Sequence, residues 1–249
     1  MRLGALAILW SVLLSGCVTE TTGGLPEPAV AEKRVQAQLD LARGYLENRD
    51  YSRARAPLNR ALEIDPRSVE GHVLMAVLLQ GEGEMALAEQ HYKLALRHEP
   101  NDSQALNNYA SFLYRQQRYD EALGLLRELV KDTEYPARSQ AYENLGLAEL
   151  IAGDREAARQ AFIRALNLNF AQPRSSLELA RLSYSDGNFE LAHEYYEAFR
   201  VRARQSPRSL CLGMKISEAL GNSDQTASYG MALQNLYPES AEADECEVP

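Results

Sequence analysis

The chain repeats a pattern of small, large and proline residues every 34 positions, and this period constrains its fold more than any other feature. Corresponding positions in successive copies are Ala42, Ala54, Ala61 and Pro66, then Ala76, Ala88, Ala95 and Pro100, then Ala110 and Ala122, and later Ala158, Ala165, Ala192 and Pro238. Small residues let two helices approach closely, so each unit is predicted to be a pair of antiparallel helices. One pair cannot bury its own apolar face, and several pairs must therefore stack into a solenoid.

The pattern resembles the tetratricopeptide repeat, and the resemblance covers about residues 35–238. It implies an all-α, right-handed α-solenoid of about six helix pairs with a concave inner surface. The repeats are expected to start near residues 35, 69, 103, 139, 173 and 206. An insertion around residues 131–136 is expected to change the superhelical angle between the third and fourth repeats. A single solenoid is the simpler interpretation, and two halves of three repeats are the alternative.

The N-terminus has the features of an export signal. A short positive start precedes an apolar run over residues 3–14, which is shorter than the roughly 20 residues that a membrane-spanning helix needs. Residues 14–17 read Leu-Ser-Gly-Cys and resemble the lipobox of bacterial lipoproteins, whose cysteine is acylated. We therefore expect a signal peptide at 1–16, lipid on Cys17, and a lipidated N-terminus with a flexible tether over 17–34. A plain secretory signal with an incidental cysteine is the alternative.

Composition and motifs argue against several other functions. The net charge of −9 disfavours nucleic-acid binding, which needs a basic surface. The four histidines, His72, His91, His98 and His193, show no metal-ligand spacing, and no nucleophile motif or phosphate-binding loop is present. We expect no metal, no small-molecule substrate, no enzyme activity, and no cofactor apart from the covalent lipid on Cys17.

Two cysteines remain beyond Cys17. Cys211 falls in the first helix of the last repeat, and Cys246 falls in an acidic C-terminal tail over 239–249. A disulfide between them would hold the tail across the open end of the stack, where a solenoid needs a cap. Two free thiols are the alternative.

The tetratricopeptide architecture also predicts which side chains face the concave surface, through fixed positions of each unit. These predict a partner-binding groove of Leu39, Arg43, Leu46, Val73, Val77, Asn107, Ser111, Tyr114 and Leu147. Leu39, Leu46, Val73 and Val77 would form an apolar patch that binds a helix or an extended peptide. The alternative is that Leu39 and Val73 pack beneath residues 25–34.

The sequence resembles the type IV pilus biogenesis lipoproteins, the pilotins PilF and PilW, in its overall layout and in several segments. These segments are 106–109, 112–114, 135–139, 143–147, 227–230 and 236–238. The resemblance implies an outer-membrane lipoprotein on the periplasmic face. Such a protein binds the pilus secretin, promotes its localisation and multimer assembly, and supports twitching motility. Val18 after the cysteine fits outer-membrane sorting. An adaptor lipoprotein of another envelope assembly machinery is the alternative.

Overall fold

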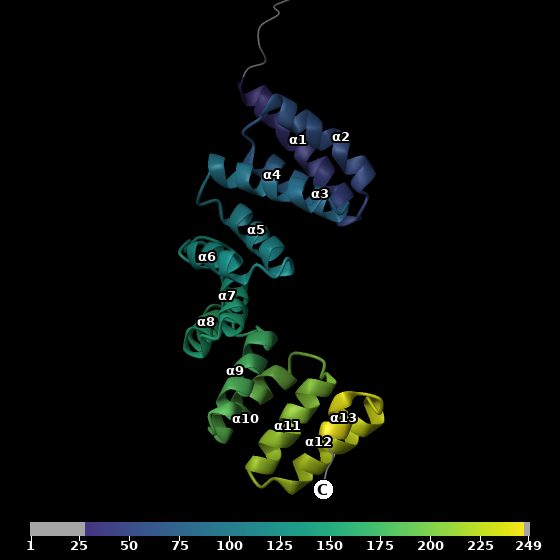
Figure 1. Ribbon diagram of the computed structural model, residues 1–249, viewed down its shortest axis with the longest axis vertical. Helices are drawn as coiled ribbons and strands as arrows, with labels where there is room; N and C mark the ends of the chain where they lie inside the picture. The colour runs from purple at the N-terminus through teal and green to yellow at the C-terminus, as the bar shows by residue number, and fades with distance from the viewer. Residues whose placement is uncertain (1–27, 247–249) are drawn as a thin grey trace, which may run out of the picture.

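Residues 28–246 are the part of the chain that the computed structural model describes, and they form thirteen α-helices and no strand. Figure 1 shows successive helix pairs following one another along the long axis, with α1 and α2 at one end and α11 to α13 at the other. The helices are α1 (Pro28–Glu47), α2 (Tyr51–Ile64), α3 (Val69–Gly81), α4 (Met85–His98), α5 (Ser103–Arg115), α6 (Tyr119–Leu129), α7 (Arg138–Ala152), α8 (Arg155–Leu168), α9 (Pro173–Ser185), α10 (Phe189–Arg200), α11 (Pro207–Ala219), α12 (Ser223–Leu236) and α13 (Ala241–Glu245). The predicted solenoid of helix pairs is confirmed.

Local sequence fixes where the helices begin and turn. Most helices start after a Ser, Asp or Asn whose side chain accepts a hydrogen bond from a backbone N–H of the first turn. These capping residues are Asp50, Ser68, Asp102, Asp154, Asn188, Ser206, Asn222 and Ser240. The tight turn inside each pair contains one residue with positive φ, which is glycine in four repeats and Arg49 or Gln117 in the other two.

The repeated small and large residues form the core. Ala42, Ala54 and Ala76 are fully buried, and they let neighbouring helices pack closely. In later repeats glycine has this role: a Cβ atom on Gly146 would lie 2.6 Å from the ring of Phe162. The aromatic ring of one helix therefore occupies the space that the missing side chain of its partner leaves open.

The helix boundaries differ from the predicted segments at both ends. The first helix begins at Pro28, so residues 28–34 are helical rather than part of the predicted tether. Proline suits a first helical position, and the segment that follows contains several good helix formers. At the other end, α13 forms within the predicted acidic tail. The first helices of repeats two to six start at 69, 103, 138, 173 and 207, close to the expected positions.

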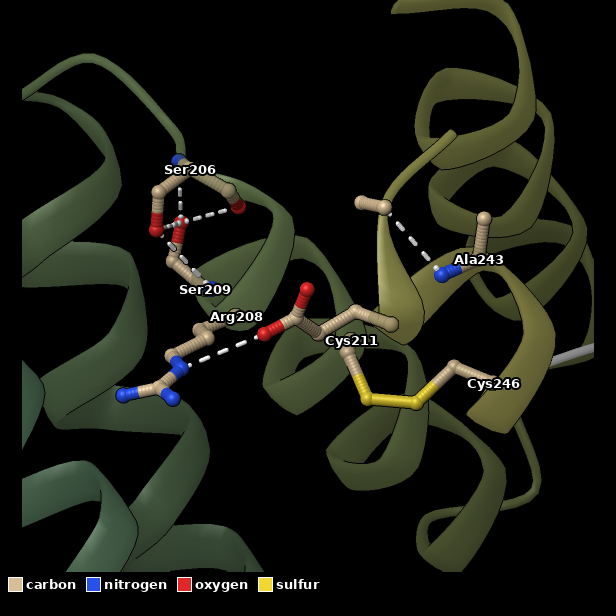
Figure 2. Close-up of a disulfide and its surroundings, with 8 residues drawn as sticks. Ser206, Arg208, Ser209, Cys211, Ala243 and Cys246 are labelled. Atoms are coloured by element: carbon tan, nitrogen blue, oxygen red, sulfur yellow. Dashed lines mark hydrogen bonds and ion pairs between the residues drawn. A yellow bond between two sulfur atoms is a disulfide. The ribbon is translucent and has the colours of Figure 1, made fainter. Parts of the chain in front are cut away.

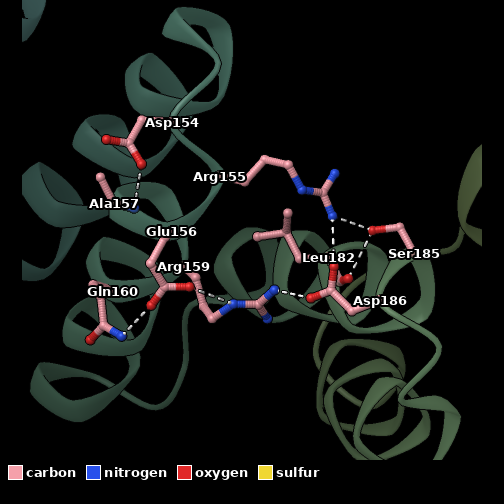
Figure 3. Close-up of polar contacts among 9 residues, drawn as sticks. All are labelled: Asp154, Arg155, Glu156, Ala157, Arg159, Gln160, Leu182, Ser185 and Asp186. Atoms are coloured by element: carbon pink, nitrogen blue, oxygen red, sulfur yellow. Dashed lines mark hydrogen bonds and ion pairs between the residues drawn. The ribbon is translucent and has the colours of Figure 1, made fainter.

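Polar contacts between neighbouring repeats supplement the apolar core. Arg155 and Arg159 of α8 reach Asp186 at the end of α9, where Arg155 Nη2 also lies 2.5 Å from Ser185 Oγ (Figure 3). Similarly, Arg127 of α6 contacts the buried carboxylate of Glu149 in α7 at 2.9 Å. These ion pairs link the fourth repeat to the repeats on both sides of it.

The third and fourth repeats remain packed against each other despite the insertion. Arg138 Nε donates to the carbonyl oxygen of Val130 at 2.9 Å. One apolar cluster includes Leu126 and Leu129 of α6 together with Ala141 and Leu145 of α7. The chain thus forms one continuous stack across this junction and is not split into separate halves there.

The open end of the stack is closed by the C-terminal segment. Cys211 of α11 and Cys246 are joined by a disulfide with a Cα–Cα distance of 5.7 Å, and Arg208 Nε lies 3.1 Å from Glu242 Oε1 (Figure 2). The side chains of Ala243 and Cys246 are both buried against the last core cluster. The sequence leaves open whether these cysteines form a disulfide or remain free thiols, and the structure contains the disulfide.

Candidate functional site

A pocket of about 220 Å³ opens on the middle of the solenoid. Four helices line it, with Ala110, Ser111, Tyr114 and Arg115 from α5, Leu126 from α6, Asn144 and Leu147 from α7, and Arg174 from α9. The pocket is therefore built by three consecutive repeats rather than by one helix pair.

The packing of the first helices explains why the pocket lies here. In the N-terminal repeats α1 packs on α3 and α3 packs on α5, and near the other end α9 packs on α11. Across the described residues, no comparable packing joins α5 to α7 or α7 to α9; instead α7 packs mainly on α6 and α8. Because α7 packs less closely on α5 and α9 than the other first helices pack on one another, the space between these helices forms the pocket.

The pocket combines apolar walls with a basic rim. Ala110, Leu126 and Leu147 supply apolar surface, while Ser111 and Asn144 supply hydrogen-bonding groups. Tyr114 packs edge-on against Tyr119, with ring centroids 5.2 Å apart, which fixes the orientation of its ring. No acidic residue lines the pocket. Apolar surface beside hydrogen-bonding groups is the kind of lining that grooves for peptides use.

Three residues of the predicted groove contribute to this pocket. Ser111, Tyr114 and Leu147 all line the pocket and are all half-buried. Asn107 lies one turn earlier on α5 and is half-buried, but it is not part of the pocket lining. The structure thus brings together residues from the third and fourth repeats.

The prediction was wrong for Leu39 and Val73. These side chains are only 2% and 1% exposed, and they belong to the N-terminal apolar core. Close packing of α1 on α3 and of α3 on α5 covers them, so they hold repeats together and are not accessible to a partner. Residues 28–34 alone do not account for their burial, because the core residues clustered with them come from α1 to α6.

The other residues predicted in the first two repeats are only partly accessible. Leu46 is half-buried and packs against the N-terminal core, and Val77 is half-buried on α3. Arg43 forms ion pairs with Glu70 of α3 and with Asp40, whose carboxylate is 2.9 Å away. Arg43 therefore links two repeats, and the predicted apolar patch is smaller than the sequence suggested.

Sequence reasoning missed Arg174 and Asn144. In this repeat the second, fifth, ninth and twelfth positions of each unit are expected to face the concave surface. Arg174 is the second residue of the fifth repeat, so the pattern could have identified it. The repeat pattern does not identify Asn144, because the expected concave position is that of the preceding residue, Glu143. Asn144 reaches the pocket through the displaced packing of α7.

Three histidines of the second repeat lie close together, His72 of α3 and His91 and His98 of α4. His72 Nδ1 lies 3.0 Å from His91 Nδ1, and the ring of His98 stacks on His72 with a centroid distance of 5.7 Å. Burial lowers the pKa of both His72 and His91. Over residues 28–246 no group of three or more His, Cys, Asp or Glu side chains is placed to hold a metal ion.

The predicted lipid site at Cys17 and the signal peptide at 1–16 lie outside the described residues. Among the helices from α1 to α13, none combines the length and the apolar character needed to cross a bilayer. The lipid anchor stays a prediction from the sequence.

Comparison with known proteins identifies close relatives. The tetratricopeptide-repeat profile matches residues 39–97 and 143–209, and a second profile of the same repeat matches residues 101–169. The type IV pilus assembly protein PilF of Pseudomonas aeruginosa is 40% identical over 245 residues, which cover 97% of this chain and 96% of that protein.

Solved structures agree with the sequence comparison. The structure of Pseudomonas aeruginosa PilF matches with a TM-score of 0.81 at 40% identity, covering 86% of this chain and 97% of that one. The structure of PilW, described as a widely conserved type IV pilus biogenesis factor, matches with a TM-score of 0.70 at 28% identity, covering 85% and 97%. Both similarities extend over the whole solenoid rather than over a few repeats.

Proposed function

Since this chain belongs to the family of tetratricopeptide-repeat proteins of type IV pilus biogenesis that includes PilF, we propose that it acts as a pilotin for the pilus secretin. It binds the secretin subunit in the periplasm and promotes its localisation and multimer assembly in the outer membrane. Pilus formation and twitching motility depend on this step. The match to PilF over 97% of the chain is the observation that carries the proposal.

The predicted lipid anchor and the pocket support a mechanism in which the protein binds and localises its partner and catalyses no reaction. Lipid on Cys17 would place the chain on the periplasmic face of the outer membrane, because two or more acyl chains hold a protein firmly to a bilayer. A secretin segment bound in the pocket between α5, α7 and α9 would then share that location. Confinement of many subunits to one surface raises their effective concentration, which favours assembly.

Complementation of a deletion strain tests the membrane role. The Cys17→Ala chain should fold normally but leave secretin multimers missing from the outer-membrane fraction, with twitching lost. Thr21→Ala, in the predicted tether, is the control, because it leaves both the lipid site and the Cys211–Cys246 disulfide intact. Normal secretin multimers in the outer membrane of the Cys17→Ala strain would contradict the anchoring role.

A second variant tests the binding role. Ser111 is a half-buried residue of the pocket lining, and the indole of Ser111→Trp should fill the pocket. The amount of secretin pulled down from envelope extracts should then fall sharply. Ser228→Trp on the exposed surface of α12 is the control for an added indole and should bind normally. If wild-type chain captures no secretin from such extracts, the proposal fails.

A further inference from the structure

The arginines of the pocket differ from most of those between repeats. The protein carries a net charge of −9, and the arginines that bridge neighbouring repeats are engaged by carboxylates. These paired arginines are Arg43, Arg55, Arg118, Arg127, Arg155 and Arg159. Within residues 28–246, Arg115 and Arg174 make no ion pair, although both line the same pocket. They are the two positive charges of a site that contains no acidic residue.

The remaining lining restricts the chemistry of the occupant. Side chains of Ala110, Leu126 and Leu147 favour an apolar group, since contact with them removes apolar surface from water. Ser111 and Asn144 can each donate a hydrogen bond to an anionic oxygen, as can both guanidinium groups. The site thus offers one apolar compartment beside a cluster of donors.

The size of the pocket restricts the occupant further. Its volume of about 220 Å³ is below the roughly 300–1,000 Å³ that is typical of pockets for drug-sized ligands. It has room for one or two side chains of an extended segment. A peptide that contributes one or two side chains is therefore a better fit than a drug-sized ligand.

We infer that the pocket between α5, α7 and α9 binds an extended segment of the secretin in which a carboxylate lies next to an apolar side chain. Arg115 and Arg174 hold the carboxylate, and the apolar side chain lies on Leu126 and Leu147. This inference rests on the proposed pilotin function and specifies its contact. The carboxylate belongs to an acidic side chain or to the chain end of the secretin, which have the same chemistry.

Titration of the full chain with short overlapping peptides from the periplasmic part of the secretin tests the inference. For the peptide that binds, Arg115→Gln and Arg174→Gln should each raise the Kd about tenfold, and the double variant should raise it further. Added salt should weaken binding to wild type and have little effect on the double variant. Arg164→Gln, on the exposed face of α8, is the matched control and should leave the Kd unchanged.

Changes in the peptide identify the carboxylate. Replacing its acidic residue by the corresponding amide should weaken binding to wild type but not to the double variant, as expected for directly coupled groups. If instead amidation of the peptide C-terminus has this effect, the carboxylate is the chain end. A bound peptide whose Kd is the same for wild type and the double variant would overturn the inference.

The outcome for whole secretin separates the two proposals. Secretin that is captured equally by wild type and by the double arginine variant leaves the pilotin function standing and removes the inference. Secretin that is captured by neither removes the pilotin function itself. Circular dichroism of the double variant should match wild type, because Arg115 and Arg174 are exposed.

Discussion

The carboxylate of Glu143 in α7 caps the start of α9 in the next repeat. Its Oε2 atom accepts hydrogen bonds from the backbone N–H of Ser175 at 3.1 Å and from the Ser175 hydroxyl at 2.8 Å. Gln172, at the capping position of α9 itself, provides no side-chain cap. Since a negative charge is favourable at a helix N-terminus, one buried side chain both starts a helix and joins two repeats.

Removal of this carboxylate should destabilise the stack. Glu143→Ala leaves the buried N–H of Ser175 without an acceptor, and we expect the free energy of unfolding to fall by about 2 kcal/mol. Urea denaturation of the purified protein at neutral pH measures this change. The control Glu156→Gln, at an exposed site on α8, should shift stability by less than about 0.5 kcal/mol. Equal effects of the two variants would refute the capping role.

Two glycines should respond oppositely to a methyl group. Gly146→Ala places a Cβ 2.6 Å from the buried ring of Phe162, and the resulting overpacking should cost about 1–3 kcal/mol. Gly124→Ala meets nothing within 4 Å on α6 and should stabilise the protein by about 0.5–1 kcal/mol through helix propensity. Thermal denaturation followed by circular dichroism compares them. A neutral Gly146→Ala would show that the close helix approach is not required.

The interface between the second and third repeats should depend on pH. Glu89 contacts Arg118 at 2.7 Å, Lys93 at 2.7 Å and the Tyr109 hydroxyl at 3.0 Å, and these groups, Arg118 foremost, lower its pKa from 4.5 to about 2. Because the folded pKa is the lower one, this stabilisation is complete above about pH 4.5 and is lost as the pH falls towards 2.

The variant Glu89→Gln tests this dependence. It should cost about 1 kcal/mol at neutral pH, a modest value because Arg118 and Lys93 are partly exposed. The difference from wild type should shrink as the pH drops below 4.5. Denaturant titrations across this pH range, with the exposed Glu63→Gln as control, measure it. A difference that stays constant with pH would exclude the ionised Glu89 as its source.

The disulfide should stabilise the C-terminal end of the stack. Cys211 and Cys246 are 35 residues apart, and loss of such a bridge typically costs about 2–4 kcal/mol. The double variant Cys211→Ala, Cys246→Ala should therefore unfold at lower urea concentration than wild type. Reductant should destabilise wild type and have no effect on the double variant. Sensitivity of both proteins to reductant would point to another cause.

The sequence predicted the fold well because repeated small residues leave few other ways to pack. Buried Ala42 and Ala76 illustrate this, since a residue without a long side chain at each equivalent position demands a close helix neighbour. The same periodicity predicts that Ser111, Tyr114 and Leu147 share one surface, and all three line the pocket. Where the repeat geometry is regular, the position of a residue within the repeat is enough to predict which surface its side chain faces.

The periodicity failed where contacts between units decide exposure. Leu39 and Val73 occupy the same repeat position as Asn107, yet they are buried and Asn107 is half exposed. The difference arises from how closely successive first helices pack, which no single unit encodes. The disulfide is similar, because the 5.7 Å between the Cα atoms of Cys211 and Cys246 depends on how α13 folds back on α11.

The one-after-another packing of the helix pairs has a mechanical consequence. Across residues 28–246, each pair packs on its immediate neighbours and none packs on a pair further along, so small rotations at successive interfaces add together. We therefore expect the molecule to bend along its length more easily than a globular domain in which all elements share one core. A peptide bound across α5, α7 and α9 would contact three successive repeats and restrict rotation at the two interfaces between them.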